Sequence, residues 1–481
     1  MIPAMRPRSA PVFEVWKATA LLALLPAACS GGAGSVGPVQ DLNVILISMD
    51  TTRADRVSAY GEHPRETTPA IDEMAAESVI FGDVWAQATA TGPSHRSMLT
   101  GMYVHRHGML ANRQMISSPF TLATELKEHG WATGAFTGGG TTREQFGLTG
   151  FDVYESSGGP HKPRARSFSR TWPMAEKWLE SLRQPDGGYQ RFFLFLHGYD
   201  PHCPYWPPAE VRDYAAWYQG SFDPREKCGF DDFSPLIQRG ELGEEEFRYI
   251  SDLYDGGVTW GDRQLAGLFA WLKERGQLDK TVIVFTSDHG ESLGEHQYVG
   301  HSRMWNEQIR VPLLIRFPRG QWAGRIDDPV ESVDIVPTLL DYLGVPIPEG
   351  VNGQSLLPRI RGDGPAPQRD MRLCKYGNYE AVLFDERWKI SFVRRSSGPE
   401  EPALFDLLND PGELNNLVES APDGRQRFDE LFERYRAWRQ AQAAEDKRWR
   451  GIKLGAADEA TQAELDQLGY AEEAEMDLEE G

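Results

Sequence analysis

The sequence predicts an α/β protein with a large, mainly parallel sheet sandwiched by helices, followed by a smaller α+β domain with a short antiparallel sheet. Two observations predict this fold class. Apolar runs of the length expected for strands buried on both faces alternate with helical patterns, which is typical of a parallel sheet covered on both sides. After Gly350 the alternation gives way to short strand-like segments and one helical pattern, which indicates a separate antiparallel sheet.

The elements of the large domain follow one another in a regular order. Continuous apolar runs predict buried strands, and periodic apolar positions between them predict helices. The strands are expected at 42–48, 132–136, 192–196, 281–286 and 311–317, and the helices at 68–77, 120–129, 172–183, 244–274 and 333–343. In the smaller domain we expect short strands at 381–384, 388–393 and 404–407, and a covering helix at 426–441.

The N-terminus has the layout of a signal peptide over residues 1–28. Basic residues precede a short apolar run at 18–25, which is too short to span a bilayer, and small residues follow it. Cys29 comes directly after Ala-Ala, as at a bacterial lipoprotein site, although Pro26 stands where Leu is usual. We expect an exported protein, anchored to a bacterial membrane by lipid on Cys29 and facing the periplasm or the exterior. Ordinary secretion with a free Cys29 is the alternative.

Charge and composition set the remaining boundaries. The chain of 481 residues carries a formal charge of −21, from 71 acidic and 50 basic residues, and ten of the acidic residues lie in 455–481 without a base. We therefore divide the chain into a flexible tether at 29–40, the large domain at 41–365, the small domain at 366–450 and an acidic tail at 451–481, which we expect to be frayed or disordered. The acid excess argues against nucleic-acid binding, and membrane contact is expected only through the lipid anchor.

Acidic and imidazole side chains follow three strands of the predicted sheet. Asp50 follows the first strand, Asp200 and His202 follow the third, and Asp288 and His289 follow the fourth. Ligands of open α/β sheets bind at the carboxyl ends of the strands. A single Asp at such a place is more often a turn or capping residue, but three strand ends together favour a divalent metal site.

A helix start beside this edge offers a nucleophile. The segment begins Thr91-Gly-Pro93-Ser94-His95-Arg96, and Pro93 suits the first turn of a helix. The free N–H groups of that turn would favour an anion. An ordinary capped helix is the simpler interpretation of these residues alone. Next to a metal, however, a hydroxyl at this position is a plausible nucleophile.

Taken together, these residues resemble the sulfatase family of the alkaline phosphatase superfamily over nearly the whole mature chain. Segment 91–101 is similar to the family's first signature, in which a modified Cys or Ser precedes x-Pro-Ser-Arg and the segment ends Leu-Thr-Gly. Further similar segments are 101–108, Asp288-His289-Gly290, 294–296, Gly300-His301, 310–313 and the closing stretch 404–417. The resemblance implies an alkaline-phosphatase-like fold and a hydrolase of sulfate or phosphate esters.

The resemblance also implies roles for individual residues. Asp50, Asp288 and His289 map onto one metal, with Thr91 as a further ligand; the metal itself (Ca, Zn, Mn or Mg) stays open. His202 and His301 map onto contacts with the substrate anion or leaving oxygen, which either ring would stabilise or protonate.

Other roles stay open between two alternatives. In two-metal relatives an Asp and two His hold a second ion, for which Asp200, His202 and His301 are the candidates. Arg53 either contacts the substrate or holds Asp50, and Arg96 lies close to the expected anion. His197 is a metal ligand or a partner of one, and residues 105–107 steer the anion or brace the nucleophile's helix. The aromatic residues Tyr199, Tyr205 and Trp206 line a substrate pocket or simply pack a loop.

The departures from the family pattern decide which chemistry we expect. Sulfatases form formylglycine from Cys or Ser, whereas this chain has Thr91, whose oxidation would give a ketone; formylglycine is therefore not expected. His95 replaces the family's Arg, as in the phosphodiesterase branch of the superfamily. Thr51 stands where many members place a second metal-binding Asp, and the Gly-Lys-Trp-His motif is missing.

Three functions remain open at this stage. The first is hydrolysis of a small or polymer-borne anionic ester by Thr91, with His95, His202 and His301 as further catalytic residues. The nucleophile leans toward phosphate monoesters, phosphate diesters or phosphonates. The alternatives are a non-catalytic protein that binds a metal or an anion, and a transferase of phosphoryl headgroups. Cys203 and Cys228 could pair in an oxidising compartment, but connectivity cannot be deduced from sequence.

Overall fold

Five strands of the central sheet lie where the sequence has the apolar runs at 42–48, 132–136, 192–196, 281–286 and 311–317. The structure is a computed structural model, and it describes residues 40–157, 166–455 and 457–467. The predicted signal peptide, Cys29 and nearly all of the predicted tether lie outside these residues. The boundary proposed between 365 and 366 stays a prediction, since all the described residues belong to one structural unit.

An eight-stranded sheet forms the centre of this unit, in the order β12-β2-β11-β8-β1-β7-β5-β6. Only β11 runs antiparallel to its neighbours β2 and β8, so the sheet is mainly parallel, as predicted. The strands are β1 Asn43–Met49, β2 Val79–Phe81, β5 Ala132–Thr137, β6 Val153–Ser156, β7 Phe192–Gly198, β8 Thr281–Thr286, β11 Leu313–Arg316 and β12 Gly324–Ile326.

The register of the three central strands brings their carboxyl ends level. Ser48 near the end of β1 pairs with His197 of β7 on one side and with Thr286 of β8 on the other. The residues that follow these strands are therefore neighbours at one edge of the sheet. This edge is where a ligand of an open α/β sheet is expected.

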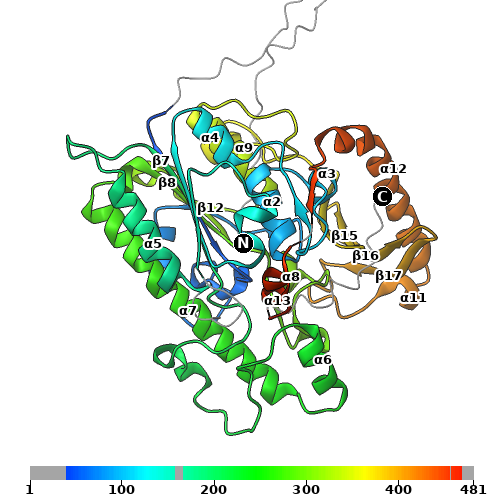
Figure 1. The fold of residues 1–481 in the computed structure, drawn as a ribbon. Coiled ribbons are helices and arrows are strands. Elements are labelled where there is room, and N and C mark those ends of the chain that lie inside the picture. Colours follow the sequence, from blue (N-terminus) through cyan, green and yellow to red (C-terminus); the bar gives the residue numbers. More distant parts are fainter. Residues whose placement is uncertain (1–39, 158–165, 456, 468–481) are drawn as a thin grey trace, which may run out of the picture. The chain divides into compact units, whose positions relative to one another are not determined.

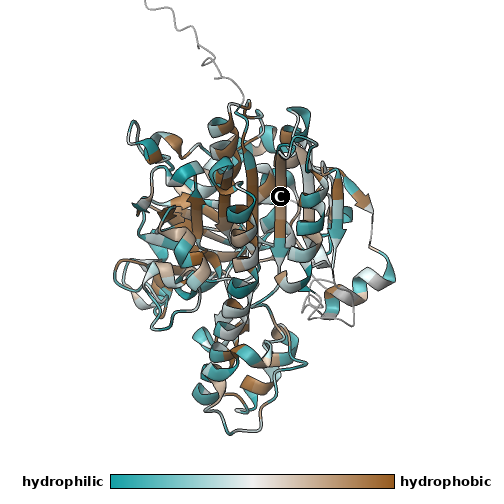
Figure 2. Ribbon diagram, turned by 90° about the vertical axis from the view of Figure 1, so that its left-hand side faces the viewer, coloured by the Kyte–Doolittle hydropathy of each residue, from teal (hydrophilic) through white to brown (hydrophobic). Residues whose placement is uncertain are grey.

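Helices cover both faces of the sheet, because side chains along each strand alternate between the two faces. Val44 and Leu46 pack with the layer that contains α2, α4 and α9, while Ile45 and Ile47 pack with α1, α5 and α7. Figure 1 shows α5 and α7 on one side of the sheet and α4 and α9 on the other, and Figure 2 shows the apolar strands between more polar helices. The helices of these layers are α1 Pro69–Ala75, α2 Thr91–Thr100, α4 Leu122–Glu128, α5 Phe168–Ser181, α7 Glu244–Glu274 and α9 Ile335–Leu343.

A second, four-stranded antiparallel sheet follows, in the order β14-β15-β16-β17. Its strands are β14 Met371–Tyr376, β15 Tyr379–Phe384, β16 Trp388–Arg395 and β17 Gly398–Asp406. Helix α12 (Gly424–Trp449) covers one face, where Phe428 and Leu431 pack against Ile390 and Phe392. The predicted α+β character of this part is confirmed, with β14 as a strand that the prediction lacked.

The prediction of a frayed acidic tail is wrong for residues 453–455 and 459–467. Strand β18 (Lys453–Gly455) pairs with β4 (Met115–Ile116), and helix α13 (Glu459–Gln467) follows. Leu465 of α13 is fully buried against Met109, Phe146 and Tyr199. Arg113 also pairs with Asp466 and donates to Gln462, so apolar and polar contacts together dock this short acidic helix.

Short elements complete the described chain. They are β3 Val84–Trp85, β9 Ser292–Leu293, β10 Val299–Gly300, β13 Val330–Glu331, α3 Val104–His107, α6 Phe230–Gln238, α8 Asn306–Ile309, α10 Leu357–Arg361 and α11 Leu417–Ser420. Within the described ranges, no helix combines the length and apolar character that crossing a membrane requires.

Candidate active site

Three predicted metal ligands come together at the carboxyl ends of β1 and β8. Asp50 follows β1, and Asp288 and His289 follow β8. All three side chains are fully buried, and one ligand atom from each lies within 4.8 Å of the others. The structure therefore assembles the first metal group that the resemblance implied.

The hydrogen bonds of His289 show why a cation fits this group. Its Nδ1–H donates to the carbonyl oxygen of Gly290 at 2.9 Å, which leaves Nε2 as an acceptor. That Nε2 lies 3.3 Å from Asp288 Oδ2, a second acceptor. Neither atom, nor Asp50 Oδ1, has a hydrogen-bond partner among the described residues. Buried acceptors this close repel one another, and a divalent cation with oxygen and imidazole ligands would remove the repulsion.

The electrostatics of Asp50 agree with this interpretation. Burial raises the pKa of Asp50 well above its usual range, and the neighbouring Asp288 carboxylate raises it further. A hydrogen bond from the Thr91 side chain acts in the opposite direction. Without a cation, the negative charge of Asp50 beside Asp288 is thus unfavourable in this buried site.

His197 orients Asp50 rather than binding alongside it. The N–H of Gly138 donates to His197 Nδ1 at 3.3 Å, so the ring carries its proton on Nε2. Nε2 then donates to Asp50 Oδ2 at 3.1 Å. Of the two roles left open by the sequence, the structure supports that of a partner to a metal ligand.

Thr91 is the first residue of α2 and is fully buried beside the metal group. Two neighbours fix the start of this helix: Ser94 Oγ donates to the carbonyl of Asp288 at 2.6 Å, and the N–H of Gly92 donates to Asn112 Oδ1 at 2.7 Å. A Cβ at Gly92 would lie 2.5 Å from Met109 Cε, so only glycine fits without a shift. The predicted nucleophile thus stands on a rigid helix start.

His95 and Arg96 both form hydrogen bonds inside the protein. His95 Nδ1–H donates to the Thr91 carbonyl within α2 at 2.8 Å, and Ser48 Oγ of β1 donates to its Nε2 at 2.8 Å, so Nε2 holds α2 against β1. The Arg96 guanidinium is fully buried and donates to the carbonyls of Ile116 and Phe146 and to Ser118 Oγ. These contacts position α2, and the substrate contacts of both residues stay predictions.

Arg53 and Asp200 also have structural partners in place of the predicted ones. Arg53 forms ion pairs at 2.7 Å with Asp55 and with Glu295, and so ties the loop after β1 to the loop after β8. Asp200 accepts the N–H of Phe168, the first residue of α5, at 3.0 Å. Several groups of three described residues have ligand atoms close enough together to hold a metal ion. Asp200 belongs to none of these groups. Asp200, His202 and His301 do not form such a group among the described residues, so the second metal site stays a prediction.

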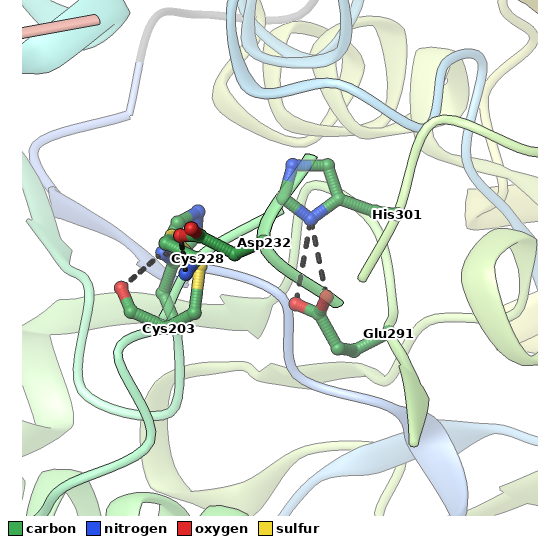
Figure 3. The surroundings of a disulfide bond; sticks show 6 residues. Cys203, Cys228, Asp232, Glu291 and His301 are labelled. Carbon is green, nitrogen blue, oxygen red and sulfur yellow. Dashed lines mark hydrogen bonds and ion pairs between the residues drawn. A yellow bond between two sulfur atoms is a disulfide. The ribbon is translucent and has the colours of Figure 1, made fainter. Parts of the chain in front are cut away.

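His202 and His301 lie next to each other near the metal group, as predicted. Their ring centres are 5.3 Å apart, and His301 is 4.5 Å from His289. His202 Nδ1–H donates to the Cys203 carbonyl at 2.7 Å. His301 Nδ1–H donates to Glu291 at 3.3 Å (Figure 3). Each ring therefore has Nε2 as its acceptor. Burial lowers the pKa of both imidazoles to about 4, so both are neutral at pH 7.

A disulfide between Cys203 and Cys228 holds the His202 loop. The N–H of Cys228 in turn donates to Asp232 Oδ2 at 2.7 Å, which links the bridge to α6 (Figure 3). The pairing that the sequence left open is thus present. It fixes the backbone directly after His202.

The sequence model of the family described as Sulfatase matches residues 42–345. The chain belongs to the sulfatase family. A second model, described as N-sulphoglucosamine sulphohydrolase, C-terminal, matches residues 294–440. The chain is therefore a hydrolase that acts on ester bonds.

Individual relatives cover most of this sulfatase-family chain. The multifunctional alkaline phosphatase superfamily protein PehA of Trinickia caryophylli is 28% identical, over 78% of this chain and 91% of PehA. Arylsulfatase K of Bos taurus is 26% identical, over 85% of this chain and 84% of its own length. The crystal structure of the phosphonate monoester hydrolase of Agrobacterium radiobacter has the same fold, with a TM-score of 0.66 and 21% identity over 86% of this chain and 97% of that one.

Some residues that shape this sulfatase-family site carry no signal in the sequence. Thr51 follows Asp50 with a left-handed backbone (φ 57°), which is strained for a β-branched residue. Its N–H donates to Asp288 Oδ1 at 3.1 Å, and its carbonyl accepts from Tyr254 at 2.7 Å. This backbone position, rather than the Thr51 side chain, joins the two metal-binding loops. Sequence reasoning looked only for a second Asp there.

The helix α2 that carries the nucleophile is braced by part of the motif at 105–107. His107 Nε2–H donates to Ser97 Oγ at 3.0 Å, while Arg106 bonds to Asp446 of α12 at 3.1 Å. These two residues therefore brace the fold, one of the two roles that the sequence left open. His105 faces a different cavity, described below.

A pocket of about 600 Å³ opens beside His202. The aromatic residues Tyr199, Tyr205 and Trp206 line it, which is one of the two roles that the sequence left open. Arg166 and Arg170 line it as well, and neither was singled out from the sequence. A pocket with aromatic walls and cationic residues suits an organic group with negative charge.

Proposed function

We propose that this sulfatase-family hydrolase cleaves phosphate monoesters, phosphate diesters or phosphonate monoesters, with Thr91 as the nucleophile. The observation that carries the proposal is a threonine, buried and hydrogen-bonded to Asp50, at the helix start where the family has Cys or Ser. A threonine cannot give the aldehyde on which the sulfatase route depends. Its hydroxyl has to attack directly, and water has to break the resulting ester.

The chain's own residues suggest two half-reactions. Thr91 Oγ1 attacks phosphorus, an Oγ1–P bond forms as the substrate's ester bond breaks, and the alcohol leaves with the proton that Thr91 loses. Water then attacks phosphorus, the Oγ1–P bond breaks, and a proton from the water restores the Thr91 hydroxyl. Because their Nδ1–H groups are engaged by Cys203 and Glu291, His202 and His301 are arranged to accept a proton from that water.

Asp50, Asp288 and His289 are the residues that would hold a divalent metal, with Thr91 as a further ligand. When bound, the metal would supply positive charge that favours the deprotonated hydroxyl and offsets charge on the anion. The unpartnered acceptor atoms of the three residues support this assignment. Their oxygen and imidazole chemistry suits several ions, so the identity of the metal is left to experiment.

The relatives support a range of ester chemistry. PehA is named for multiple activities, and the Agrobacterium radiobacter protein is named for hydrolysis of phosphonate monoesters. Arylsulfatase K is named for sulfate esters. Sulfate esters are therefore the competing substrate class that an assay must include.

The test is a comparison of four substrate classes on the full chain. Metal-stripped protein, reloaded separately with Ca, Mg, Mn or Zn, would be assayed on an aryl phosphate, a phosphate diester, a phosphonate monoester and an aryl sulfate. We expect the phosphorus esters to be turned over faster than the sulfate. Faster turnover of the aryl sulfate would overturn the proposed substrate class.

Variants on α2 test the nucleophile itself. We expect Thr91→Ala to abolish turnover and Thr91→Ser to retain part of it, since serine keeps the hydroxyl. Thr100→Ala is the matched control on the same helix, because Thr100 Oγ1 bonds only to backbone among the described residues, donating to the Arg96 carbonyl and accepting from the Met102 N–H. Intact-mass analysis of quenched Thr91→Ser protein during turnover should show one added phosphoryl group. Unchanged turnover in Thr91→Ala would refute the mechanism.

The same assay separates the two alternative functions. A protein without catalytic activity would show no turnover with any metal and would still bind the metal. A transferase would release the alcohol faster when an acceptor alcohol is added, with the phosphoryl group found on that acceptor. We expect the released phosphate to equal the released alcohol instead.

We also propose that the protein is exported and anchored by lipid on Cys29. The disulfide between Cys203 and Cys228 supports export, because such bonds persist mainly in oxidising compartments. Intact mass of protein extracted from membranes is the test. A diacylglyceryl mass on a chain that begins at Cys29 is the expected result, and a chain cleaved elsewhere without lipid would contradict it.

A further inference from the structure

We propose a second anion site, in a pocket of about 240 Å³ between α3, the C-terminal sheet and the end of α12, that binds a sulfate or phosphate group. The basic pocket, as we call it, is lined by Lys375, Arg394, Arg439, Arg450, Lys453 and Glu380. His105 lines it as well, and no lining residue is shared with the pocket beside His202. The inference is independent of the reaction at Thr91.

The charges in this pocket do not balance. Lys375 and Arg394 share Glu380, at 2.6 and 2.9 Å, and Glu380 is the single carboxylate among the lining residues. Arg439 pairs with Asp446 at 2.6 Å, but Asp446 also pairs with Arg106. Positive charge therefore exceeds negative charge here, in a protein whose formal charge is −21.

Several donors in the pocket lack a partner. The Arg450 side chain has no hydrogen bond or ion pair to any described residue, and it packs over Gly108, where a Cβ would lie 2.8 Å from Arg450 Cγ. Arg439 Nε is buried without a hydrogen bond to any residue in the described ranges, and so is His105 Nε2, which lies 3.6 Å from Asp446 Oδ2. Such donors cost free energy when nothing accepts from them. A tetrahedral oxyanion accepts from several guanidinium and ammonium groups at once.

The pKa of His105 also reflects the positive charges around the basic pocket. Its ring is held between Tyr103 and Trp438, with ring centres 5.5 and 5.4 Å away. Burial lowers the pKa of His105 well below its usual range, and Arg439, Arg106 and Lys375 lower it further by repelling a second ring proton. A pocket that resists one more proton is suited to an anion.

The size of the pocket limits the ligand. A volume of about 240 Å³ admits one sulfate or phosphate group with a small substituent, but not a long acidic chain. Such a group has two sources, namely a free inorganic anion or an anionic group carried on a larger substrate. Both present the same oxygens to the basic pocket.

Titration of the full-length protein with sodium sulfate, followed by calorimetry and by the melting temperature, tests the site. We expect Arg450→Gln to weaken sulfate binding about tenfold, as expected for the loss of a charged hydrogen bond. Since Arg450 is exposed and unpaired among the described residues, the variant should fold normally. Arg436→Gln is the matched control on the exposed face of α12, where Arg436 pairs only with Glu433. Sodium chloride at equal ionic strength controls for screening.

A second variant removes a buried donor without a charge. His105→Phe keeps the ring packing against Tyr103 and Trp438 but removes Nε2, and we expect weaker sulfate binding there too. Thr91→Ala should leave this binding component intact, which separates it from anion binding at the active site. Equal sulfate affinity in wild type, Arg450→Gln and His105→Phe would overturn the proposal, as would an effect of sulfate no larger than that of chloride.

A final titration distinguishes the two sources of the anion. Glucose 6-phosphate would be compared with inorganic phosphate in wild type and Arg450→Gln. Tighter binding of the sugar phosphate that depends on Arg450 supports a group on a larger substrate. Equal binding that depends on Arg450 supports a free anion. Binding of both that does not depend on Arg450 refutes the site.

Discussion

The position of the ring proton decides the role of each histidine in this site. A backbone donor or acceptor occupies Nδ1 of His197, His202 and His289, and so sets which nitrogen of each ring carries hydrogen. His197 presents a donor to Asp50, whereas His289 presents an acceptor to the metal group. One imidazole therefore orients a ligand, and the other is suited to be one.

The same reasoning predicts the effect of replacing His202. Its Nε2 is an acceptor, so His202→Ala should slow the attack of water on the Thr91 ester by about 10²–10⁴-fold. The ester should then accumulate, visible as a burst of released alcohol and as a phosphoryl mass on the protein. If His202 instead protonates the leaving oxygen, the burst disappears and turnover depends more steeply on the leaving group's acidity.

For single residues, the sequence predicted metal ligands better than it predicted hydrogen-bond partners inside the protein. Asp50, Asp288 and His289 could be assigned because a strand end fixes where the next side chain goes. The roles of Arg96 and Asp200 could not be assigned in this way. Whether a guanidinium is buried, or a carboxylate caps a helix, depends on which backbone groups fold against it. The left-handed Thr51 had no signal at all, because threonine rarely adopts that conformation.

Among the elements, α2 is the platform of the site, and its position depends on contacts made behind it. Arg96 anchors the helix to two carbonyls from the segments at 116 and 146. Ser94 and His95 tie it to the ends of β8 and β1. The geometry of Thr91 is thus set by side chains that face away from the reaction.

Replacing Arg96 by Met tests whether this residue is structural. The change leaves the carbonyls of Ile116 and Phe146 buried without a donor, so we expect the free energy of unfolding to fall by about 2–5 kcal/mol. Chemical denaturation measures this loss. A stable variant with a raised KM would show instead that Arg96 contacts the substrate, as the sequence suggested.

The C-terminal sheet carries a buried ion pair that makes its stability depend on pH. Burial alone would raise the pKa of Glu380, but Lys375 and Arg394 lower it to about 2, and Tyr435 donates to the same carboxylate. A carboxylate with a lowered pKa stabilises the fold above its unfolded value near 4.5, and this contribution is lost as the pH falls toward 2. The amount at stake is at most roughly 3 kcal/mol.

Denaturation at pH 7 and pH 3 checks this dependence. Glu380→Gln should be less stable than wild type at pH 7, and the difference should shrink at pH 3, where Glu380 begins to protonate. Glu433→Gln, an exposed position on α12, serves as the control and should show little difference at either pH. A constant gap between Glu380→Gln and wild type at both pH values would contradict the assignment.

The spacing of apolar residues predicted whole helices and strands well where the buried positions are all apolar. It predicted them poorly where charged residues occupy some of these positions. Helix α7 begins and ends at the predicted residues 244 and 274, because its apolar stripe is long and acidic residues mark its first turn. Strand β14 was missed, since Arg372 and Lys375 interrupt its apolar pattern. The tail was misread because composition counted its charges and not the buried Leu465.

On the scale of the whole molecule, the metal group joins parts that are distant along the chain. Asp50 and Asp288 follow neighbouring strands, and Thr91 comes from a helix between them in sequence. Without a cation, two buried carboxylates and an imidazole acceptor meet at this junction. A bound metal would therefore stabilise the sheet edge as well as serve the chemistry.

Metal removal should accordingly destabilise the protein. A ligand that binds only the folded state at about 100 times its Kd adds about 2.7 kcal/mol, so a chelator should lower the melting temperature and the reloaded metal should restore it. Asp50→Asn should remove this response, while the metal-free variant should be at least as stable as metal-free wild type because one buried charge is gone. Asp262→Asn is the matched control, since Asp262 is buried but only caps α1 through the N–H groups of Ala70 and Ile71. A melting temperature that is indifferent to chelator in wild type, or a metal response that survives in Asp50→Asn, would show that these residues do not form the metal site.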